Sequence, residues 1–189
     1  TDDAPRPLAD RLRPAALDEV VGQDHLVGPE GTLTRLLKRG HLPSLILWGP
    51  PGSGKTTVAR LLADQTDLEF EQLSAIFSGV QDLRKAFDRA MERRQTVKGP
   101  LLFIDEIHRF NRSQQDSFRP HMEDGTITLV GATTENPSFE LNAAVLSRAS
   151  VLVFHRLDEA AIEMLLARAE ALEGRGLPLD AAARESLVL

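Results

Sequence analysis

Leu45-Ile-Leu-Trp-Gly-Pro-Pro-Gly-Ser-Gly-Lys-Thr-Thr57 is the stretch that decides the fold. It begins with an apolar run over 45–48, which is typical of a buried strand, and continues into the pattern Gly-x4-Gly-Lys-Thr; a helical pattern follows. A strand, a glycine-rich loop and a helix in this order are the setting that the phosphate-binding loop requires. The stretch therefore predicts an α/β fold that binds a nucleoside triphosphate, and the alternative is a chance glycine turn.

Each residue type in this loop has a physical role. Gly52 and Gly54 tolerate positive φ, so successive N–H groups turn toward phosphate oxygens at the positive end of the next helix. Lys55 supplies a full charge for the β- and γ-phosphates, and the Thr56 hydroxyl is placed to ligate Mg²⁺. The predicted nucleotide-binding residues of the loop are Gly49, Pro50, Pro51, Gly52, Ser53, Gly54, Lys55, Thr56 and Thr57.

Composition sets the limits for the rest of the chain. At 189 residues and 42% hydrophobic, the chain is long enough for one α/β domain and the start of another. It has no apolar run long enough to span a bilayer and no export signal, so we expect a cytoplasmic protein with no membrane partner. The absence of cysteine excludes disulfides, thiolate metal sites and redox roles. A net charge of −6 argues against a uniformly basic nucleic-acid binder.

A second chemical cluster follows the apolar run over 101–104. Asp105 and Glu106 come directly after this predicted strand, which places both at the edge where open α/β sheets bind ligands. We expect Asp105 to hold Mg²⁺ through its water shell and Glu106 to orient the water that attacks the γ-phosphate. Without the upstream phosphate loop, the same pair would merely cap the next helix.

A third predicted strand, over 126–134, ends at the same edge. Pro137 breaks the chain there and leaves Asn136 at the strand end, where its amide can hydrogen-bond the γ-phosphate or the attacking water. In isolation, an Asn before a Pro is a turn residue.

Arg148 precedes the predicted strand over 151–154. If this strand is parallel to the others, Arg148 lies at the amino ends of the strands, opposite the nucleotide, and cannot easily serve its own site. We therefore expect an arginine finger that reaches the γ-phosphate of a neighbouring subunit in a closed ring. The alternative is a surface ion pair.

The segments before the phosphate loop allow two interpretations. Residues 1–14 lack apolar periodicity, which predicts an extended arm. Val20, Val21 and Gly22 can contact an adenine ring, or the same segment is a helix start capped by Asp18.

The segments after the phosphate loop predict helices. After Gly79, one stripe is expected to be core, and Arg84 lies near that helix start on a face of mixed charge. A further helix is expected to be capped by Asp158 and to stop at Gly174. The core stripe consists of Val80, Leu83, Phe87 and Met91. The five histidines show no metal-ligand spacing and are predicted to be structural.

Three longer motifs resemble those of a known family. They are Ile104-Asp-Glu-Ile-His-Arg-Phe-Asn-Arg-Ser-Gln-Gln-Asp116, Glu123-Asp-Gly-Thr-Ile-Thr128 and Gly131-Ala-Thr-Thr-Glu-Asn-Pro-Ser-Phe-Glu140. With Arg11–Pro14 and Val21–His25, they are similar to the AAA+ ATPases of the RarA/MgsA group, whose eukaryotic counterpart is the Werner helicase-interacting protein. The resemblance implies a five-stranded parallel sheet flanked by helices. It also implies three segments along the chain: an arm over 1–24, an ATPase core over 25–156 and the start of a helical lid over 157–189.

The resemblance also implies roles for single residues. Asp105-Glu106 matches the family's Walker B, Asn136 its sensor 1 and Arg148 its trans arginine finger. The arm, with Arg13 and Pro14, and the Val21-Gly22 segment match the part that borders the adenine of ATP or ADP. Gly49–Thr56 matches Walker A.

For the whole protein, the resemblance implies a DNA-dependent, oligomeric, nucleoid-associated ATPase. It acts at stalled forks, ends and single-strand gaps, with single-strand DNA-binding protein as a partner. The family's sensor 2 arginine and oligomerisation region lie beyond residue 189, so we expect this chain alone to bind ATP poorly, to stay monomeric and to hydrolyse slowly. Arg84, Arg109 and Arg112 are the candidate DNA contacts because a ring would turn their helices toward its centre.

Alternative functions stay open at this point. Asp-Glu-Ile-His and Gly-Ala-Thr-Thr also occur in DExH-box helicases, but that core needs a second RecA-like domain. A clamp-loader-like motor and a nucleotide-gated scaffold with little turnover are further alternatives. The set of Glu106, Asn136 and Arg148 argues against a degenerate site.

Overall fold

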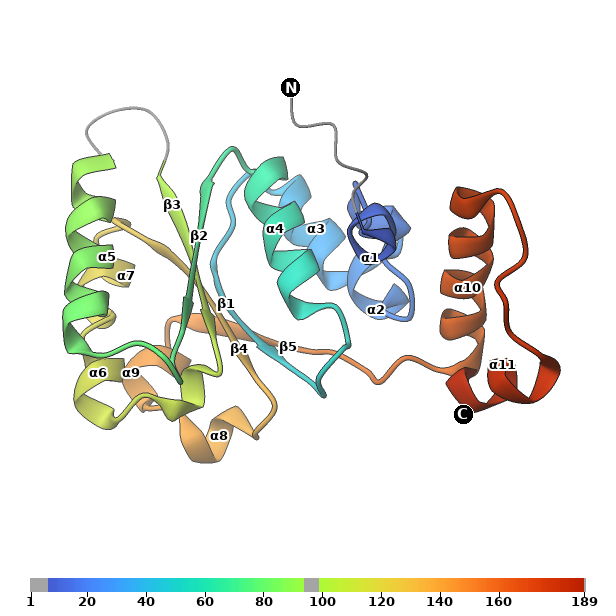
Figure 1. Ribbon diagram of the computed structural model, residues 1–189. Helices are drawn as coiled ribbons and strands as arrows, with labels where there is room; N and C mark the ends of the chain where they lie inside the picture. Colours follow the sequence, from blue (N-terminus) through green and yellow to red (C-terminus); the bar gives the residue numbers. More distant parts are fainter. Residues whose placement is uncertain (1–6, 94–98, 189) are drawn as a thin grey trace, which may run out of the picture.

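The computed structural model describes residues 7–93 and 99–188, and its centre is a five-stranded sheet (Figure 1). The strands lie in the order β2-β3-β4-β1-β5, and every neighbouring pair is parallel. This confirms the predicted five-stranded parallel sheet. The strands are β1 (Ser44–Trp48), β2 (Glu69–Ser74), β3 (Pro100–Asp105), β4 (Thr128–Thr133) and β5 (Ala149–Val153).

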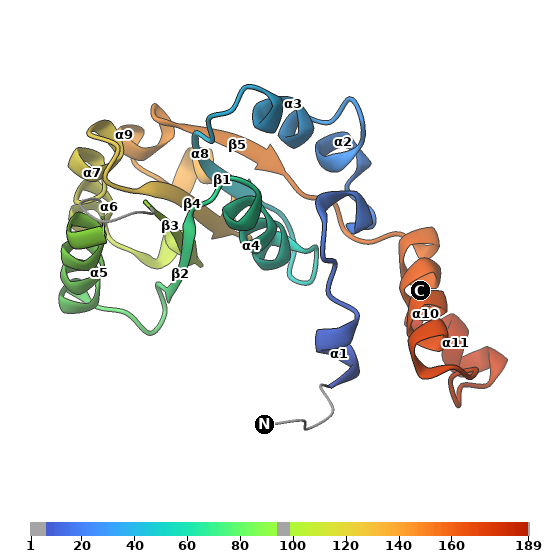
Figure 2. The ribbon, with the colours of Figure 1, turned by 90° about the horizontal axis from the view of Figure 1, so that it is seen from above.

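Helices cover both faces of the sheet (Figure 2). On one face lie α2 (Asp24–Val27), α3 (Thr32–Lys38) and α4 (Lys55–Gln65), and on the other lies α5 (Val80–Arg93). The short helix η1 (Leu17–Glu19) precedes β1. Other short helices connect strands: η2 (Ile107–Arg109), α6 (Arg112–Asp116), α7 (Arg119–Glu123), α8 (Pro137–Glu140) and α9 (Ala143–Leu146).

Alternation along each strand divides the core into two layers. In β1, Leu45 and Leu47 pack with α3 and α4, whereas Ile46 packs with α5 and η2 on the other face. A strand that is buried on both faces reads as a continuous apolar run, which is why 45–47 and 101–104 were recognisable in the sequence. Because all the strands are parallel, the loops that follow their carboxyl ends lie at one edge of the sheet.

Three local expectations are wrong in detail. In α5, Val80 and Met91 are more than half exposed, because the buried stripe is formed by Leu83, Phe87 and two alanines. Asp18 caps no helix, since η1 begins after Ala16 without a side-chain cap. The arm is not wholly extended, because α1 (Leu8–Arg11) forms a helical turn, while residues 1–6 lie outside the described part.

Beyond β5, an extended segment leads to α10 (Glu159–Glu173) and α11 (Ala181–Val188), which stand apart from the sheet (Figure 1). Asp158 caps α10 through the Ala161 N–H, and Gly174 ends it with a φ of 67°, both as expected. Arg11 binds Glu173 at 3.2 Å, which ties the arm to α10. Within the described ranges 7–93 and 99–188, none of the helices has the length and apolarity needed to cross a membrane.

Candidate functional site

The phosphate loop lies at the carboxyl end of β1 and leads into α4. Gly54 is the N-cap of α4 with a φ of 98°, and Gly52 has a φ of 74°. Both conformations are strained for residues with a side chain, so the loop needs glycine at these places. The loop residues 51–57 line a cavity of about 440 Å³ together with Asp105, Glu106 and Thr134. One cavity therefore joins the α4 N-terminus to the carboxylates.

Neighbouring strands hold the loop in place. The Gly49 N–H donates to the Thr133 carbonyl at 3.1 Å, and the Phe154 N–H donates to the Trp48 carbonyl at 2.7 Å. A Cβ on Gly49 would lie 2.6 Å from Phe154, so a larger residue would push the loop away from β5. The start of the loop is thus fixed to the ends of β4 and β5.

Lys55 is bound inside this loop. Its Nζ donates to the carbonyls of Gly49 at 2.5 Å and Pro50 at 2.8 Å. Partial burial lowers the pKa of Lys55 from its ordinary value, and the negative charges of Asp105 and Glu106 oppose that shift. The lysine charge and the two carboxylates therefore interact across the cavity, as the sequence predicted for one edge of the sheet.

Thr56 and Asp105 line the same cavity and suit a magnesium ion. A hydroxyl and a carboxylate are the oxygen ligands that Mg²⁺ takes in phosphate sites, with water and phosphate oxygens completing its shell. In the part of the chain that the structure describes, no group of three or more His, Cys, Asp or Glu side chains is arranged to hold a metal ion. The donors present fit an ion that binds together with the phosphates.

Glu106 directly follows β3 and has an unusual backbone conformation. Its φ of 56° and ψ of 41° are left-handed, which is uncommon for a residue other than glycine and costs about 1–2 kcal/mol. The turn carries the chain into η2 and brings a histidine back to the carboxylate: His108 Nε2 lies 3.2 Å from Glu106 Oε2. The His108 side chain is only 8% exposed.

His108 is a residue whose position the sequence did not reveal. We predicted the histidines to be structural, yet His108 Nδ1 also lies 2.8 Å from Thr133 Oγ1 at the end of β4. Its ring therefore bridges Glu106 and the strand that leads to Asn136. The signal available in the sequence was a histidine two residues after the glutamate, but spacing alone does not show which way the ring turns.

Asn136 follows β4 at the same sheet edge. It is the N-cap of α8, and its Oδ1 accepts the Ser138 N–H at 3.0 Å. The side-chain amide hydrogens have no hydrogen bond to any described residue, so they are available as donors. The turn-residue interpretation is thus correct for the oxygen, and the predicted role of the amide stays a prediction.

A second, smaller cavity of about 190 Å³ lies beside the loop. It is lined by the arm residues Arg13 and Pro14, by Val20 and Val21, by Leu157 and by Leu165 of α10, among others. Its apolar walls suit the face of an adenine ring. Gly22 does not line this cavity: it packs beside Leu157, where a Cβ would meet the leucine side chain at 2.8 Å.

Gln23 fixes the back of the loop, which the sequence did not predict. Its side chain is fully buried, and Nε2 donates to the carbonyls of Ser53 at 3.1 Å and His155 at 2.7 Å. Its Oε1 accepts the His155 N–H at 2.9 Å. One amide thus joins the arm, the phosphate loop and the segment that leads to α10.

Arg148 lies outside the cavity. It immediately precedes β5, whose first residue pairs with Ser44 at the start of β1, so it is at the amino end of the sheet. Its guanidinium forms an ion pair with Glu123 and lies 3.0 Å from Ser147 Oγ. The five residues of β1 separate it from the loop by about 16 Å at ~3.3 Å per residue.

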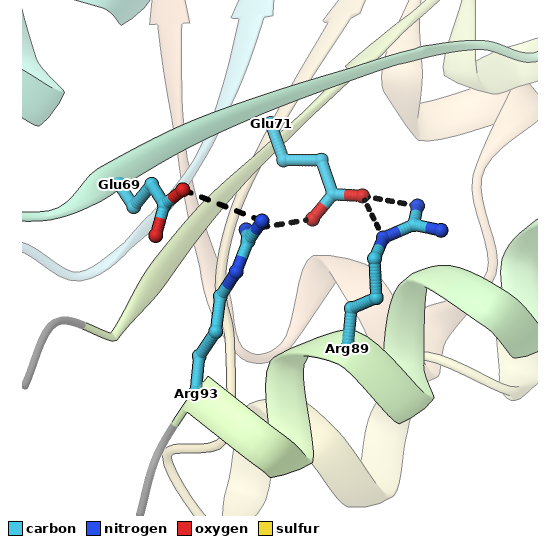
Figure 3. Close-up of polar contacts among 4 residues, drawn as sticks. All are labelled: Glu69, Glu71, Arg89 and Arg93. Carbon is cyan, nitrogen blue, oxygen red and sulfur yellow. Dashed lines mark hydrogen bonds and ion pairs between the residues drawn. The ribbon is translucent and has the colours of Figure 1, made fainter. Parts of the chain in front are cut away.

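Two groups of arginines differ in their partners. Arg89 and Arg93 point toward β2 and bind Glu71, and Arg93 also binds Glu69 (Figure 3). The predicted DNA contacts Arg84, Arg109 and Arg112 are exposed, and their side chains form no ion pair within the described ranges. They belong to segments that follow the carboxyl ends of β2 and β3.

Comparisons with known proteins identify the family of this chain and similar proteins. Residues 45–157 match the AAA family, described as "ATPase family associated with various cellular activities". Over 176 residues the chain is 50% identical to replication-associated recombination protein A of Escherichia coli K12, covering 93% of this chain and 39% of that protein. It is 45% identical to ATPase WRNIP1 of Dictyostelium discoideum over 162 residues, or 86% of this chain and 18% of the relative.

A solved structure has a similar fold. The Thermotoga maritima RuvB Holliday junction branch migration motor superposes with a TM-score of 0.67 at 31% identity, covering 86% of this chain and 55% of that chain. The chain spans about two fifths of the length of the bacterial relatives that it matches.

Proposed function

The chain belongs to the AAA ATPase family, and from that premise we propose that it binds Mg²⁺ and ATP at the carboxyl edge of its sheet and hydrolyses ATP between subunits. The observation that carries this proposal is the single cavity that joins the phosphate loop, Asp105 and Glu106. The AAA fold and the relatives' names support a motor of replication and recombination.

The chain's own residues divide the chemistry among them. The loop N–H groups and Lys55 bind the β- and γ-phosphates, while Thr56 and Asp105 hold the magnesium ion. When bound, the ion supplies positive charge that neutralises charge developing on the phosphate oxygens. Glu106 orients the attacking water, and Asn136 donates its amide to the γ-phosphate or to that water.

The adenine half of the site completes the proposal. The cavity beside Val20 and Val21 would hold the base, with Arg13 and Pro14 from the arm as one wall. Residues 157–189 would form the start of a lid over the base, because Leu157 and Leu165 reach the same cavity. Gly22 would contribute only through its close packing on Leu157.

Arg148 would act on the site of a neighbouring subunit. At the far end of the sheet it is about 16 Å from its own loop, which is longer than an arginine side chain can bridge. In a head-to-tail ring, each subunit presents one surface to a different surface of the next, so an arginine at one edge can meet a nucleotide at the other. The ion pair with Glu123 would then hold Arg148 until the neighbour docks.

The test mixes two inactive variants. ATP hydrolysis is measured across a protein concentration series for Arg148→Ala, for Glu106→Gln and for their mixture. We expect each variant alone to be nearly inactive and the mixture to regain activity, because some interfaces then combine an intact Glu106 with an intact Arg148. If both variants bind ATP and the mixture stays inactive, catalysis occurs within one subunit and the proposal of a shared site is wrong.

The DNA part of the proposal rests on three exposed arginines. Arg84, Arg109 and Arg112 carry charges that are not neutralised by described carboxylates. We propose that they contact phosphates of DNA at gaps, ends or forks, in a cytoplasmic, nucleoid-associated oligomer with single-strand DNA-binding protein as a partner. The names of the bacterial relatives support a role in replication and recombination.

Matched variants test the DNA contact. If Arg84 neutralises one DNA phosphate, replacing it by Ala should reduce the slope of log affinity against log salt by about 1. Arg89→Ala is the control, because Glu71 already occupies that guanidinium in the folded chain. Equal slopes for wild type and Arg84→Ala, repeated for Arg109 and Arg112, would remove these residues from the DNA interface.

A further inference from the structure

A line of polar contacts runs from the catalytic carboxylate to the end of β4. It begins at Glu106 Oε2, passes through both nitrogens of His108 and reaches Thr133 Oγ1. Thr133 Oγ1 in turn accepts the Glu135 N–H at 3.0 Å, one residue before Asn136. The line therefore connects the segment of Glu106 with the segment of Asn136, the two residues that act on the attacking water in the proposed mechanism.

The hydrogen-bonding capacity of each group sets the direction of this line. A hydroxyl has one proton to donate, and Thr133 Oγ1 lies 2.8 Å from His108 Nδ1 and 3.2 Å from the Glu135 carbonyl. The shorter contact favours donation to His108, which makes Nδ1 the acceptor. In a neutral imidazole the other nitrogen then carries the hydrogen, so Nε2–H faces Glu106.

The surroundings of the two side chains show why this matters for Glu106. The His108 side chain is 8% exposed, whereas the Glu106 side chain is 25% exposed and lines the phosphate cavity. A nearly buried ring thus contacts one carboxylate oxygen from behind, at 3.2 Å. This leaves Oε1 to accept the hydrogen of a water in the cavity.

We propose that His108 is a positioning residue for ATP hydrolysis: its Nε2–H donates to Glu106 Oε2, and Thr133 at the end of β4 orients the ring by donating to Nδ1. The inference rests on the proposed function, because His108 acts only through Glu106. A long side chain at a left-handed turn has several orientations, and holding one of them avoids the loss that follows when a reacting group is misplaced by an ångström.

The first test compares two substitutions of His108, each of which keeps a polar group at the position of one ring nitrogen. In His108→Gln the amide nitrogen replaces Nε2 and keeps the contact with Glu106, whereas in His108→Asn the amide replaces Nδ1 and keeps only the contact with Thr133. We expect kcat to fall about 10²-fold in His108→Ala and His108→Asn, and to be largely restored in His108→Gln, with the affinity for ATP unchanged. A ring that merely supports the fold would favour Asn at least as much as Gln.

The second test uses the glutamate itself. In a Glu106→Gln background, single-turnover hydrolysis should not decrease further when His108→Ala is added, because the group through which His108 acts is already gone. Thr133→Val should lower kcat less than His108→Ala, and Thr133→Ser, which keeps the hydroxyl, should stay close to wild type. Unfolding midpoints of all variants show whether any loss of activity reflects a loss of folding.

Each alternative result has a definite meaning. Full activity of folded His108→Ala beside an inactive Glu106→Gln would overturn the role of His108 alone. Higher activity of His108→Ala than of wild type would also overturn it, since His108 would then restrain Glu106. Equal hydrolysis by wild type and Glu106→Gln would overturn both the role of His108 and the proposed role of Glu106.

Discussion

The two ends of the sheet differ in how complete their chemistry is. At the carboxyl ends, one chain brings the phosphate loop and both carboxylates into a single cavity, with Lys55 bound by loop carbonyls. At the amino ends, the described partners of Arg148 are Glu123, the Ala144 carbonyl and the Ser147 hydroxyl. In the proposed mechanism, binding and water activation therefore belong to one chain, whereas the cation that completes catalysis comes from another.

The largest effect is expected at the amino ends of the strands, where Arg148 lies. Arg148→Ala should lower the hydrolysis rate of the assembled protein by about 10³–10⁵-fold, which is the range for arginine fingers. Its affinity for ATP should stay unchanged, and the rise of activity per chain with protein concentration should disappear. A role between subunits would be contradicted if the specific activity of the wild type did not change with protein concentration and Arg148→Ala lost the same fraction of it at every concentration.

The next largest effect is expected at the carboxyl ends of the strands, where the phosphate loop lies. Lys55→Ala should weaken ATP binding by about 10–100-fold, since a hydrogen bond to a charged group contributes ~1.5–3 kcal/mol. Titration with a fluorescent ATP analogue measures this loss. Lys38→Ala, at a lysine of α3 that does not line the phosphate cavity, is the matched control and should bind like wild type. Equal affinity of both variants would show that the loop binds phosphate through its backbone alone.

A smaller effect is expected behind the loop, where Gln23 joins three segments. Gln23→Ala leaves two carbonyls and one N–H without their partner, which should cost about 1–3 kcal/mol and lower the unfolding midpoint by several degrees. Thermal unfolding followed by circular dichroism measures the change. Gln65→Ala, at an exposed position on α4, should have little effect. Identical midpoints for the two variants would mean that Gln23 does not fasten the loop.

The smallest effect is expected for Glu123→Gln. Hydrogen bonds from Arg119 and the charge of Arg148 lower the pKa of Glu123 below its ordinary 4.5. The stability that ionised Glu123 contributes through these arginines is therefore present above pH 4.5 and is lost as the pH falls through the lowered pKa. Because Glu123 is exposed, we expect unfolding midpoints of variant and wild type to coincide near neutral pH. A clear destabilisation at pH 7 would instead assign Glu123 a structural role.

Local patterns were sufficient for much of the site. The strand, loop and helix around 45–57 and the carboxylates after 101–104 were predictable, because apolar runs mark buried strands and parallel strands end at one edge. The cap at Asp158 and the glycine end of α10 were also predictable, because each depends only on neighbours within four residues.

Other features were out of reach of the sequence. The stripe of α5 extended to Val80 and Met91 by periodicity, but in the folded chain both side chains are more than half exposed. The contacts of His108 with Glu106 and of Gln23 with Ser53 and His155 depend on side-chain orientation and on residues up to 132 positions apart.

Residue types and their order were enough to establish the fold family, the phosphate loop, the two carboxylates and the position of Arg148 at the opposite end of the sheet. Those features follow from hydrophobic periodicity and from residue types that only one chemistry requires at that spacing. The packing of the folded chain, by contrast, decided that Glu106 contacts His108, that Gln23 closes the back of the loop and that Arg89 is bound by Glu71 while Arg84 is not. The reason is that a side chain's partner depends on the packing of distant strands, which no local pattern specifies.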